Sequence, residues 1–170
     1  MRITLKKVLY ALLIVFGLLF FAYLLLPTPF KDFPTPPPGS VQSMEDADVE
    51  TPLRRAYFTN YTREEVIAHY KNQFKYRPFT LELNYPPEDA QTLIRDQTRS
   101  YYLEELAHPF RESVYINGFI ATKPQDDIWY KGVHYQEKIT IKYVPTSIAL
   151  RIVFGGLTLL LMAWMIHEYA

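Results

Sequence analysis

The residues with the clearest capacity for chemistry are histidines and carboxylates that could bind a metal ion. His69 lies four residues after Glu65, so a helix would place both side chains on one face, where they could act as two ligands. Other candidate ligands are His108, His134, Glu104, Glu105, Asp126 and Asp127. None of them falls in a recognisable metal-site spacing such as HExxH. A histidine at the edge of an amphipathic helix is usually an ordinary solvated side chain, so we predict no metal site, no cofactor and no catalytic residue.

A second group of candidates consists of aromatic residues in the C-terminal half of the chain. The group comprises Tyr101, Tyr102, Tyr115, Trp129, Tyr130 and Tyr135. In alternating strands about half of these rings would point into the core, which is the simpler interpretation for any single ring. The others could form an exposed patch, and such a patch marks a partner surface if it is contiguous. We predict a candidate partner surface made of Tyr101, Tyr102, Trp129 and Tyr130.

Composition and motifs exclude several classes of function. Lys and Arg together number 18 and Asp and Glu 18, so the formal net charge is zero and gives no basis for a nucleic-acid partner. The sequence has no GxSxG nucleophile motif, no phosphate-binding loop and no dinucleotide-binding glycine pattern. It also has no cysteine, which excludes disulfides and lipid attachment through cysteine.

Two uninterrupted apolar runs, 8–26 and 148–166, flank the part of the chain that carries these candidates. Each run is about 19 residues, which is roughly 28 Å of helix and close to the thickness of a bilayer's hydrocarbon core. We therefore expect two transmembrane helices and a lipid bilayer as a partner. A cleaved signal peptide is the alternative for the first run, but the run is too long and lacks a small-x-small cleavage site.

Cations next to the first run indicate its orientation. Arg2, Lys6 and Lys7 lie in residues 1–7 and favour a cytoplasmic N-terminus in the plasma membrane. The tail 167–170 would then be cytoplasmic too. Arg151 is the one charge inside an apolar run, and so near its end it could snorkel to water or lipid phosphate. We expect Arg151 and Trp164 to act as interfacial anchors, although an intramembrane charge can also mark a transport path.

Residues 27–52 contain most of the prolines and an acidic cluster, with few large apolar side chains. This composition does not favour a core, and consecutive prolines adopt extended polyproline geometry. We expect a semi-rigid stalk.

Residues 53–145 have the patterns of a small α+β domain. Thr62 and Glu65 form a capping box that predicts a helix over 63–74, with Tyr70 and Phe74 on its apolar stripe. Strict alternation predicts a half-buried strand over 79–85. Pro86-Pro87 can end this strand and begin a second helix. The residues expected to share a face of that helix are Ala90, Leu93, Ile94 and Gln97.

Extended patterns follow the second helix. Strands are expected over 100–106 and 113–120, and Lys131-Gly132 predicts a hairpin between 128–130 and 133–143. In the last strand Ile139, Ile141 and Tyr143 would face the core and the intervening residues would face water. The expected fold is two helices on a three- or four-stranded antiparallel meander, flanked by the two transmembrane helices.

The stretch 55–66, with its Thr62-Arg63-Glu64-Glu65-Val66 helix start followed by Tyr70 and Phe74, resembles two-pass bacterial membrane proteins of unknown function. The resemblance, to a type found in candidate-phylum bacteria, runs from about residue 53 to the C-terminus. It implies a location and a layout, with a small extracytoplasmic domain, and it implies no activity and no site residue.

Two functions remain open from the sequence. The first is an extracytoplasmic binding or assembly module, an accessory subunit of a cell-envelope complex that would have a membrane or envelope protein as its partner. The alternative is a small membrane-tethered metal-dependent hydrolase acting on envelope material. Convergent histidines and carboxylates in a cleft would favour the hydrolase, whereas exposed aromatic rings without them would favour the module.

Overall fold

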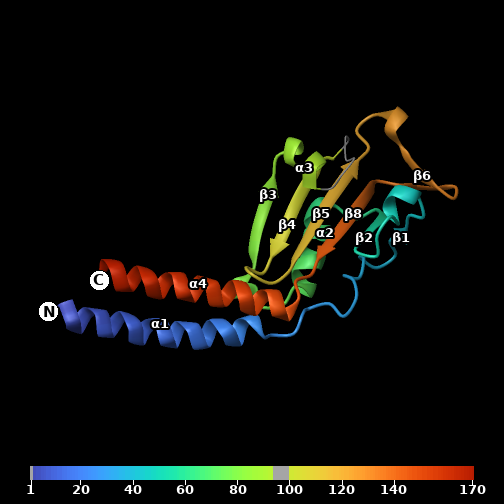
Figure 1. Cartoon of the computed structure of the whole chain (residues 1–170). Helices are drawn as coiled ribbons and strands as arrows, with labels where there is room; N and C mark the ends of the chain where they lie inside the picture. The colour runs from blue at the N-terminus through green and yellow to red at the C-terminus, as the bar shows by residue number, and fades with distance from the viewer. Residues whose placement is uncertain (1, 94–99) are drawn as a thin grey trace. The chain divides into compact units, whose positions relative to one another are not determined.

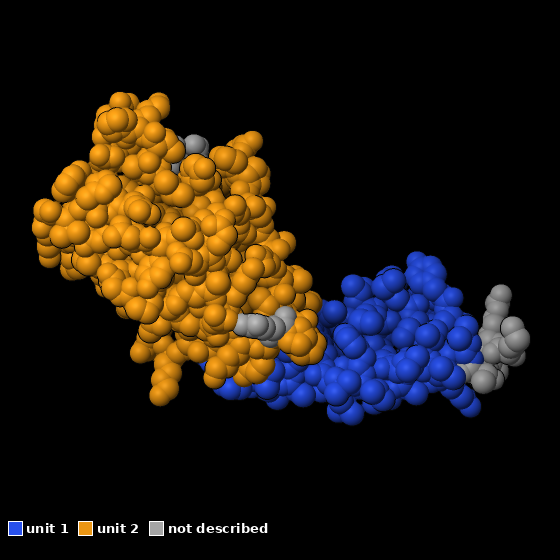
Figure 2. All heavy atoms as spheres, turned by 180° about the vertical axis from the view of Figure 1, so that it is seen from behind, with its two compact units in different colours: residues 1–28, 145–170 blue, residues 29–144 orange. Residues whose placement is uncertain are grey.

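The computed structural model describes residues 2–93 and 100–170. The chain forms two compact units, which Figure 2 distinguishes by colour. One consists of Met1–Thr28 with Pro145–Ala170, and the other is Pro29–Val144. The first contains two terminal apolar helices and the second is an α+β domain with an antiparallel sheet (Figure 1). The predicted class of fold is therefore confirmed.

The helical unit is an antiparallel pair. Helix α1 (Arg2–Leu24) packs against α4 (Ile148–Tyr169), and both are long and apolar enough to cross a membrane, judged by length and composition. Gly155 permits a close approach, since a Cβ at this position would lie 2.5 Å from Leu24 Cδ1 and 3.3 Å from Phe20 Cε1. Gly17 has a similar role opposite Leu159. The two glycines thus allow the helices to pack closely in the absence of a GxxxG motif.

Each helix of the pair supplies a cation to the C-terminal end of the other. Arg151 is 2% exposed and donates from Nη1 to the carbonyls of Leu24 and Leu26, at 3.4 and 3.5 Å, and from Nε to Thr146 O. At the opposite end, Lys6 Nζ donates to His167 O at 2.9 Å. The last carbonyls of a helix lack intrahelical partners and carry partial negative charge. Arg151, expected to reach water or lipid phosphate near the end of its run, donates to carbonyls at the ends of both helices.

The other predicted anchors differ in exposure. Lys7 and Trp164 are exposed, and Tyr10 OH donates to Ala163 O. Arg2 begins α1, but its side chain lies outside the described part of the structure.

The domain contains a six-stranded antiparallel sheet in the order β1-β2-β8-β5-β4-β3. These strands are β1 (Val41–Gln42), β2 (Arg54–Thr59), β8 (Glu137–Val144), β5 (Ser113–Ile120), β4 (Tyr102–Ala107) and β3 (Leu81–Tyr85). A three- or four-stranded meander was expected, and the difference is mainly β2, which pairs with β8. Nearly every residue of β2 is buried, so this strand has no alternation of apolar and polar residues for the sequence to reveal.

The predicted hairpin turn is present outside this sheet. Strands β6 (Ile128–Tyr130) and β7 (Val133–Tyr135) pair with each other around Lys131 and Gly132, both of which have positive φ. The strand expected over 133–143, however, is divided into β7, which belongs to the hairpin, and β8, which belongs to the six-stranded sheet. Ile128 and Tyr135 of the hairpin pack with Phe58 of β2. Short 3-10 turns occupy Asp46–Asp48, Arg77–Phe79 and Pro124–Asp126.

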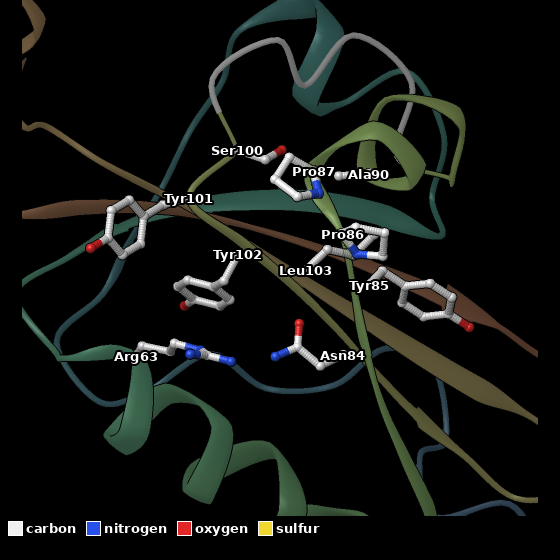
Figure 3. Close-up of a pocket in the computed structure, with 10 residues that line it drawn as sticks. All are labelled: Arg63, Asn84, Tyr85, Pro86, Pro87, Ala90, Ser100, Tyr101, Tyr102 and Leu103. Carbon is white, nitrogen blue, oxygen red and sulfur yellow. The ribbon is translucent and has the colours of Figure 1, made fainter.

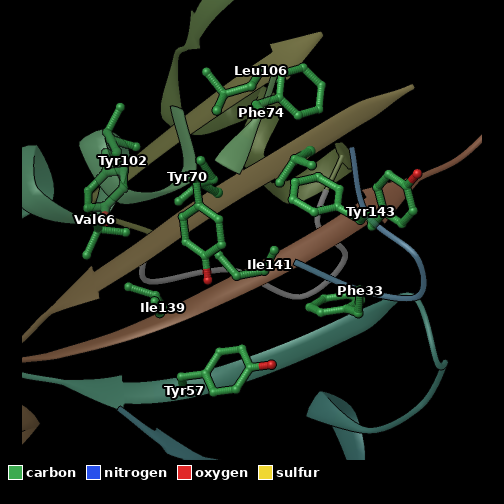
Figure 4. Packing of buried hydrophobic residues seen from close by; sticks show 14 residues of the cluster. Phe33, Tyr57, Val66, Tyr70, Phe74, Tyr102, Leu106, Ile139, Ile141 and Tyr143 are labelled. Carbon is green, nitrogen blue, oxygen red and sulfur yellow. The ribbon is translucent and has the colours of Figure 1, made fainter. Parts of the chain in front are cut away.

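Helix α2 (Arg63–Gln73) covers one face of the sheet, and its capping box is formed as predicted. Tyr70 and Phe74 are buried, as their place on the apolar stripe indicated. They pack with Ile139, Ile141 and Tyr143 of β8, which also face this core as expected (Figure 4).

Helix α3 (Pro87–Leu93) lies at the other face, where Ala90 packs on Leu103. Two expectations about exposure are wrong. Thr140, predicted to face water, is buried on this second face. Strand β3, predicted to be half-buried, is exposed along most of its length because it is an edge strand. The predicted helix residues Ile94 and Gln97 lie outside the described residues.

The predicted stalk is largely part of the domain. Phe30 and Phe33 are buried in the main core, and Thr35 donates from its backbone N–H to Gln73 Oε1 at 3.0 Å. Further along, β1 extends the sheet and Asp48 binds Lys138. A proline-rich segment can adopt extended geometry and still bury two aromatic rings, so composition alone was a poor guide to its packing.

These contacts predict that residues 29–144 are the smallest stable domain. We expect the fragment 29–144 to unfold cooperatively and the fragment 53–144 to be less stable by at least about 3 kcal/mol, because buried phenylalanines typically contribute this much or more. Urea denaturation followed by circular dichroism measures the difference. Equal midpoints for the two fragments would show that residues 29–52 do not support the core.

Candidate functional site

The four aromatic residues predicted to form a partner surface divide between two places and two environments. Tyr101 and Trp129 are 59% and 64% exposed, and Tyr130 is half-buried. Tyr102 is only 6% exposed, so its assignment to a surface is wrong. Tyr101 and Tyr102 adjoin one hollow at the start of β4, whereas Trp129 and Tyr130 belong to the β6–β7 hairpin.

The hollow next to Tyr101 is the best-defined candidate site of the domain. It has a volume of about 230 Å³ and lies where α2, α3 and β4 begin and where β3 ends. Rings of tyrosine and proline make up much of its wall, and Arg63 and Asn84 point toward one another across it (Figure 3). Its lining residues are Arg63, Asn84, Tyr85, Pro86, Pro87, Ala90, Ser100, Tyr101, Tyr102 and Leu103.

Arg63 is the cation of this site, and the fold holds its side chain in place. As the first residue of α2, it extends to the buried carboxylate of Glu104 on β4 and forms a salt bridge with it. The guanidinium carbon also lies 5.2 Å from the centroid of the Tyr102 ring. The hydrogen bond to Glu104 raises the pKa of Arg63, so the group stays charged. About a third of the side chain is exposed, which leaves it accessible to a ligand.

Glu137 lies behind the pocket and positions Tyr102. The Tyr102 hydroxyl donates to Glu137 Oε1 at 2.5 Å, and Oε2 has no hydrogen-bond partner among the described residues. Burial raises the pKa of Glu137 to about 7, although the hydrogen bond from Tyr102 opposes the shift. Burial, and then the nearby Glu137 charge, raise the pKa of Tyr102 well above its ordinary range. Below a pH of about 7 the pair therefore carries both the phenol proton and the carboxyl proton, and as pH rises the carboxyl proton is lost first.

Gly118 on β5 makes this pair possible. A Cβ at position 118 would overlap both the Tyr102 ring and the Glu137 carboxylate. An isolated glycine inside a strand pattern often marks such a close approach. Gly118 was thus the one sequence signal for this part of the site. Arg63, Asn84 and Glu137 were missed because they come together only through the pairing of strands far apart in the chain.

The arrangement favours binding of a molecule with a ring or another flat apolar part. The tyrosine rings and prolines can stack on such a part, and Arg63, Asn84 and Ser100 can hydrogen-bond to its polar groups. The Glu137 carboxylate does not line the hollow. Its effect on a ligand would be indirect, through the position of Tyr102.

The predicted metal-ligand candidates are not brought together by the fold. Within the described residues, no group of three or more His, Asp and Glu side chains could hold a metal ion. Glu65 bonds to Thr62 in the capping box, while Glu104 binds Arg63 and Glu105 accepts from Tyr85 OH. Asp126 and Asp127 lie in a 3-10 turn and at its end.

The three histidines lie in three different environments. His69 bonds to Thr35 O at 2.9 Å and to Gln73, while exposed His134 lies next to Asp127 and Trp129. The expectation of a solvated side chain is wrong for His108, which is buried and stacks on Phe74 with ring centroids 3.9 Å apart.

The buried His108 ties several elements together. Its Nδ1 lies 2.8 Å from Glu112 Oε1, and its Nε2 lies 2.6 Å from Lys75 O. Arg111 binds the same carboxylate oxygen of Glu112 at 2.8 Å. The imidazole therefore links the β4–β5 turn to the chain that follows α2, which is a structural role.

Comparisons with models of protein families, with curated proteins and with solved structures find no match to this chain.

The raised pKa of Glu137 predicts a pH dependence of stability. In the unfolded chain this carboxyl titrates near 4.5 and in the folded chain near 7, so between these values the folded state binds more protons. The free energy of unfolding should then fall as pH rises from about 4.5 to about 7, by a Glu137 contribution on the order of 3 kcal/mol. Replacing Glu137 by Gln should remove this contribution.

The measurement is chemical denaturation at several pH values, followed by near-ultraviolet circular dichroism of the tyrosines. Replacing exposed Glu88 by Gln provides the matched control and should leave the slope unchanged. A Glu137→Gln variant with the slope of the parent would show that another group dominates the titration.

Proposed function

We propose that this chain is a two-pass membrane protein whose helix pair anchors an α+β binding module on one side of the plasma membrane. The observation that carries the proposal is the helix pair itself, with apolar side chains facing outward and polar contacts at its ends. The binding role is inferred from the hollow at Arg63 and from the exposed aromatic rings.

The outward side chains support a lipid environment for the pair. Exposed leucines occur along both helices, among them Leu12, Leu18, Leu19, Leu160 and Leu161. A soluble protein rarely exposes a contiguous apolar surface of this extent, because its contact with water is unfavourable. In a bilayer the same side chains face hydrocarbon, where their exposure is favourable.

The polar contacts of the pair also fit a bilayer. Backbone groups within hydrocarbon need hydrogen-bond partners inside the protein. An α-helix supplies these partners except at its ends, where the last carbonyls have no intrahelical donor. Arg151 binds such carbonyls at the end of α1 and Lys6 binds one at the end of α4. Both cations thus lie near the boundaries of the expected spans, where a charge is tolerated best.

The proposed orientation follows from the cations Arg2, Lys6 and Lys7 at the start of α1. The positive-inside bias favours a cytoplasmic position for this end and for the end of α4. The α+β domain would then lie outside the cytoplasm, as the resemblance to two-pass bacterial membrane proteins also implies.

We infer that the module serves as an accessory subunit that binds a membrane or envelope protein. Exposed Tyr101 borders the hollow that contains Arg63, a combination typical of residues that dominate protein interfaces. The alternative, a metal-dependent hydrolase, finds less support because His69, His108 and His134 each contact other groups in separate places.

The topology predicts a pattern of thiol labelling. Single cysteines replacing Thr122 and Glu168, tested separately, should react differently with a membrane-impermeant maleimide in intact cells. Thr122→Cys should be labelled, since Thr122 is exposed on the domain, and Glu168→Cys should be labelled only after the membrane is permeabilised. The parent chain has no cysteine and provides the blank. Labelling of Glu168→Cys alone in intact cells would reverse the orientation, and labelling of both would contradict a two-pass anchor.

The binding role predicts site-dependent crosslinking. A photoreactive phenylalanine analogue at Tyr101 should form a discrete adduct in native membranes, and the same analogue at exposed Glu88 serves as the control position. The adduct should weaken when Arg63 is replaced by Gln in the same protein, because the pocket then loses its cation. Equal adducts at both positions, or an adduct indifferent to Arg63, would contradict a partner bound at this hollow.

A further inference from the structure

Strand β3 forms one end of the six-stranded sheet (Figure 1). It pairs with β4 on one side, and no described strand pairs with its other side. An edge of this kind presents backbone N–H and C=O groups that can pair with a further strand. Proteins commonly block such edges with lysine, proline or a bulge.

The free edge of β3 is apolar and lacks these blocking features. Leu81 and Leu83, which alternate onto the same face of the sheet, are 51% and 42% exposed. Glu82 is the only charged residue of the strand, and Lys71 of the same chain binds it at 2.7 Å. Pro78 and Pro86 lie just outside the strand, so any added ladder is confined to about five residues.

We propose that β3 pairs with β3 of a second copy of this chain, antiparallel and about a two-fold axis centred on Leu83. Leu83 then lies opposite Leu83 of the other copy, and Leu81 lies opposite Tyr85. Glu82 lies opposite Asn84, whose amide N–H can donate to the carboxylate that Lys71 already binds. Apolar side chains therefore meet on one face of the joined sheet and complementary polar groups meet on the other.

Charge and backbone geometry select this register over its neighbours. A two-fold axis centred on Glu82 would place the two Glu82 carboxylates opposite each other, which is unfavourable. An axis centred on Asn84 would bring Pro86, which has no backbone N–H, into the ladder opposite Glu82. The centre at Leu83 pairs all five residues of β3 and avoids both problems.

Pairing through β3 would also bring the second copy next to the candidate site. Asn84 and Tyr85 line the hollow with Arg63, and in the dimer they lie opposite Glu82 and Leu81 of the other copy. The second copy thus contributes side chains to the rim of each hollow. The inference goes beyond the proposed function, because it requires neither a membrane nor a particular orientation.

Disulfide crosslinking in a chain without cysteine tests the register directly. Directly opposite Cα atoms in antiparallel strands are about 4.5 to 5.5 Å apart, within the range of a disulfide. In the proposed register the two Glu82 Cα atoms are about 8 Å apart, beyond that range. Full-length Leu83→Cys and Glu82→Cys variants are oxidised with copper phenanthroline in isolated membranes, and dimers are measured by non-reducing electrophoresis.

We expect the Leu83→Cys variant to form at least about ten times as much disulfide dimer as the Glu82→Cys variant. Coexpressed Glu82→Cys and Asn84→Cys chains, carrying different tags, should crosslink to each other. Introducing Glu82→Lys and Asn84→Lys together into Leu83→Cys, which places like charges opposite each other, should abolish its dimer while circular dichroism shows an intact fold. Dimers of equal yield from Leu83→Cys and Glu82→Cys, no dimer from either, or crosslinks only to a different protein would overturn the proposal.

Discussion

The fold of the domain depends on strand β8, which pairs with β2 on one side and with β5 on the other. This double pairing joins the first long strand of the domain to the last. It also places Ile139, Ile141 and Tyr143 under α2, where they form the centre of the main core. Without β8 the sheet would be two separate groups of strands, and the two-stranded group of β1 and β2 would be marginally stable at best.

The same strand connects the core to the candidate site through polar contacts. Glu137, the first residue of β8, accepts a hydrogen bond from Tyr102, and the ring of Tyr102 lies beneath the guanidinium of Arg63. Arg63 in turn binds Glu104. These contacts connect β8, β4 and α2, so the geometry of the hollow is coupled to the packing of the sheet.

The helical unit illustrates a different use of a buried charge. Arg151 is enclosed between α1 and α4, and its partners include the backbone carbonyls of Leu24, Leu26 and Thr146. Such carbonyls need a donor wherever water is scarce, and an arginine can supply several donors from one planar group. The guanidinium of Arg151 thus links the ends of the two helices.

Local sequence determined much of this protein. The apolar runs indicated α1 and α4, the capping box at Thr62 located α2, an extended pattern located β5, and alternation located the core face of β8, since each signal depends on neighbouring residues alone. Tertiary structure alone decided the pairing of β2 with β8, the burial of Phe30, Phe33 and His108, and the contact of Glu137 with Tyr102. These features join residues separated by tens of positions. Their free energy comes from desolvation and packing between distant segments, which no local pattern records.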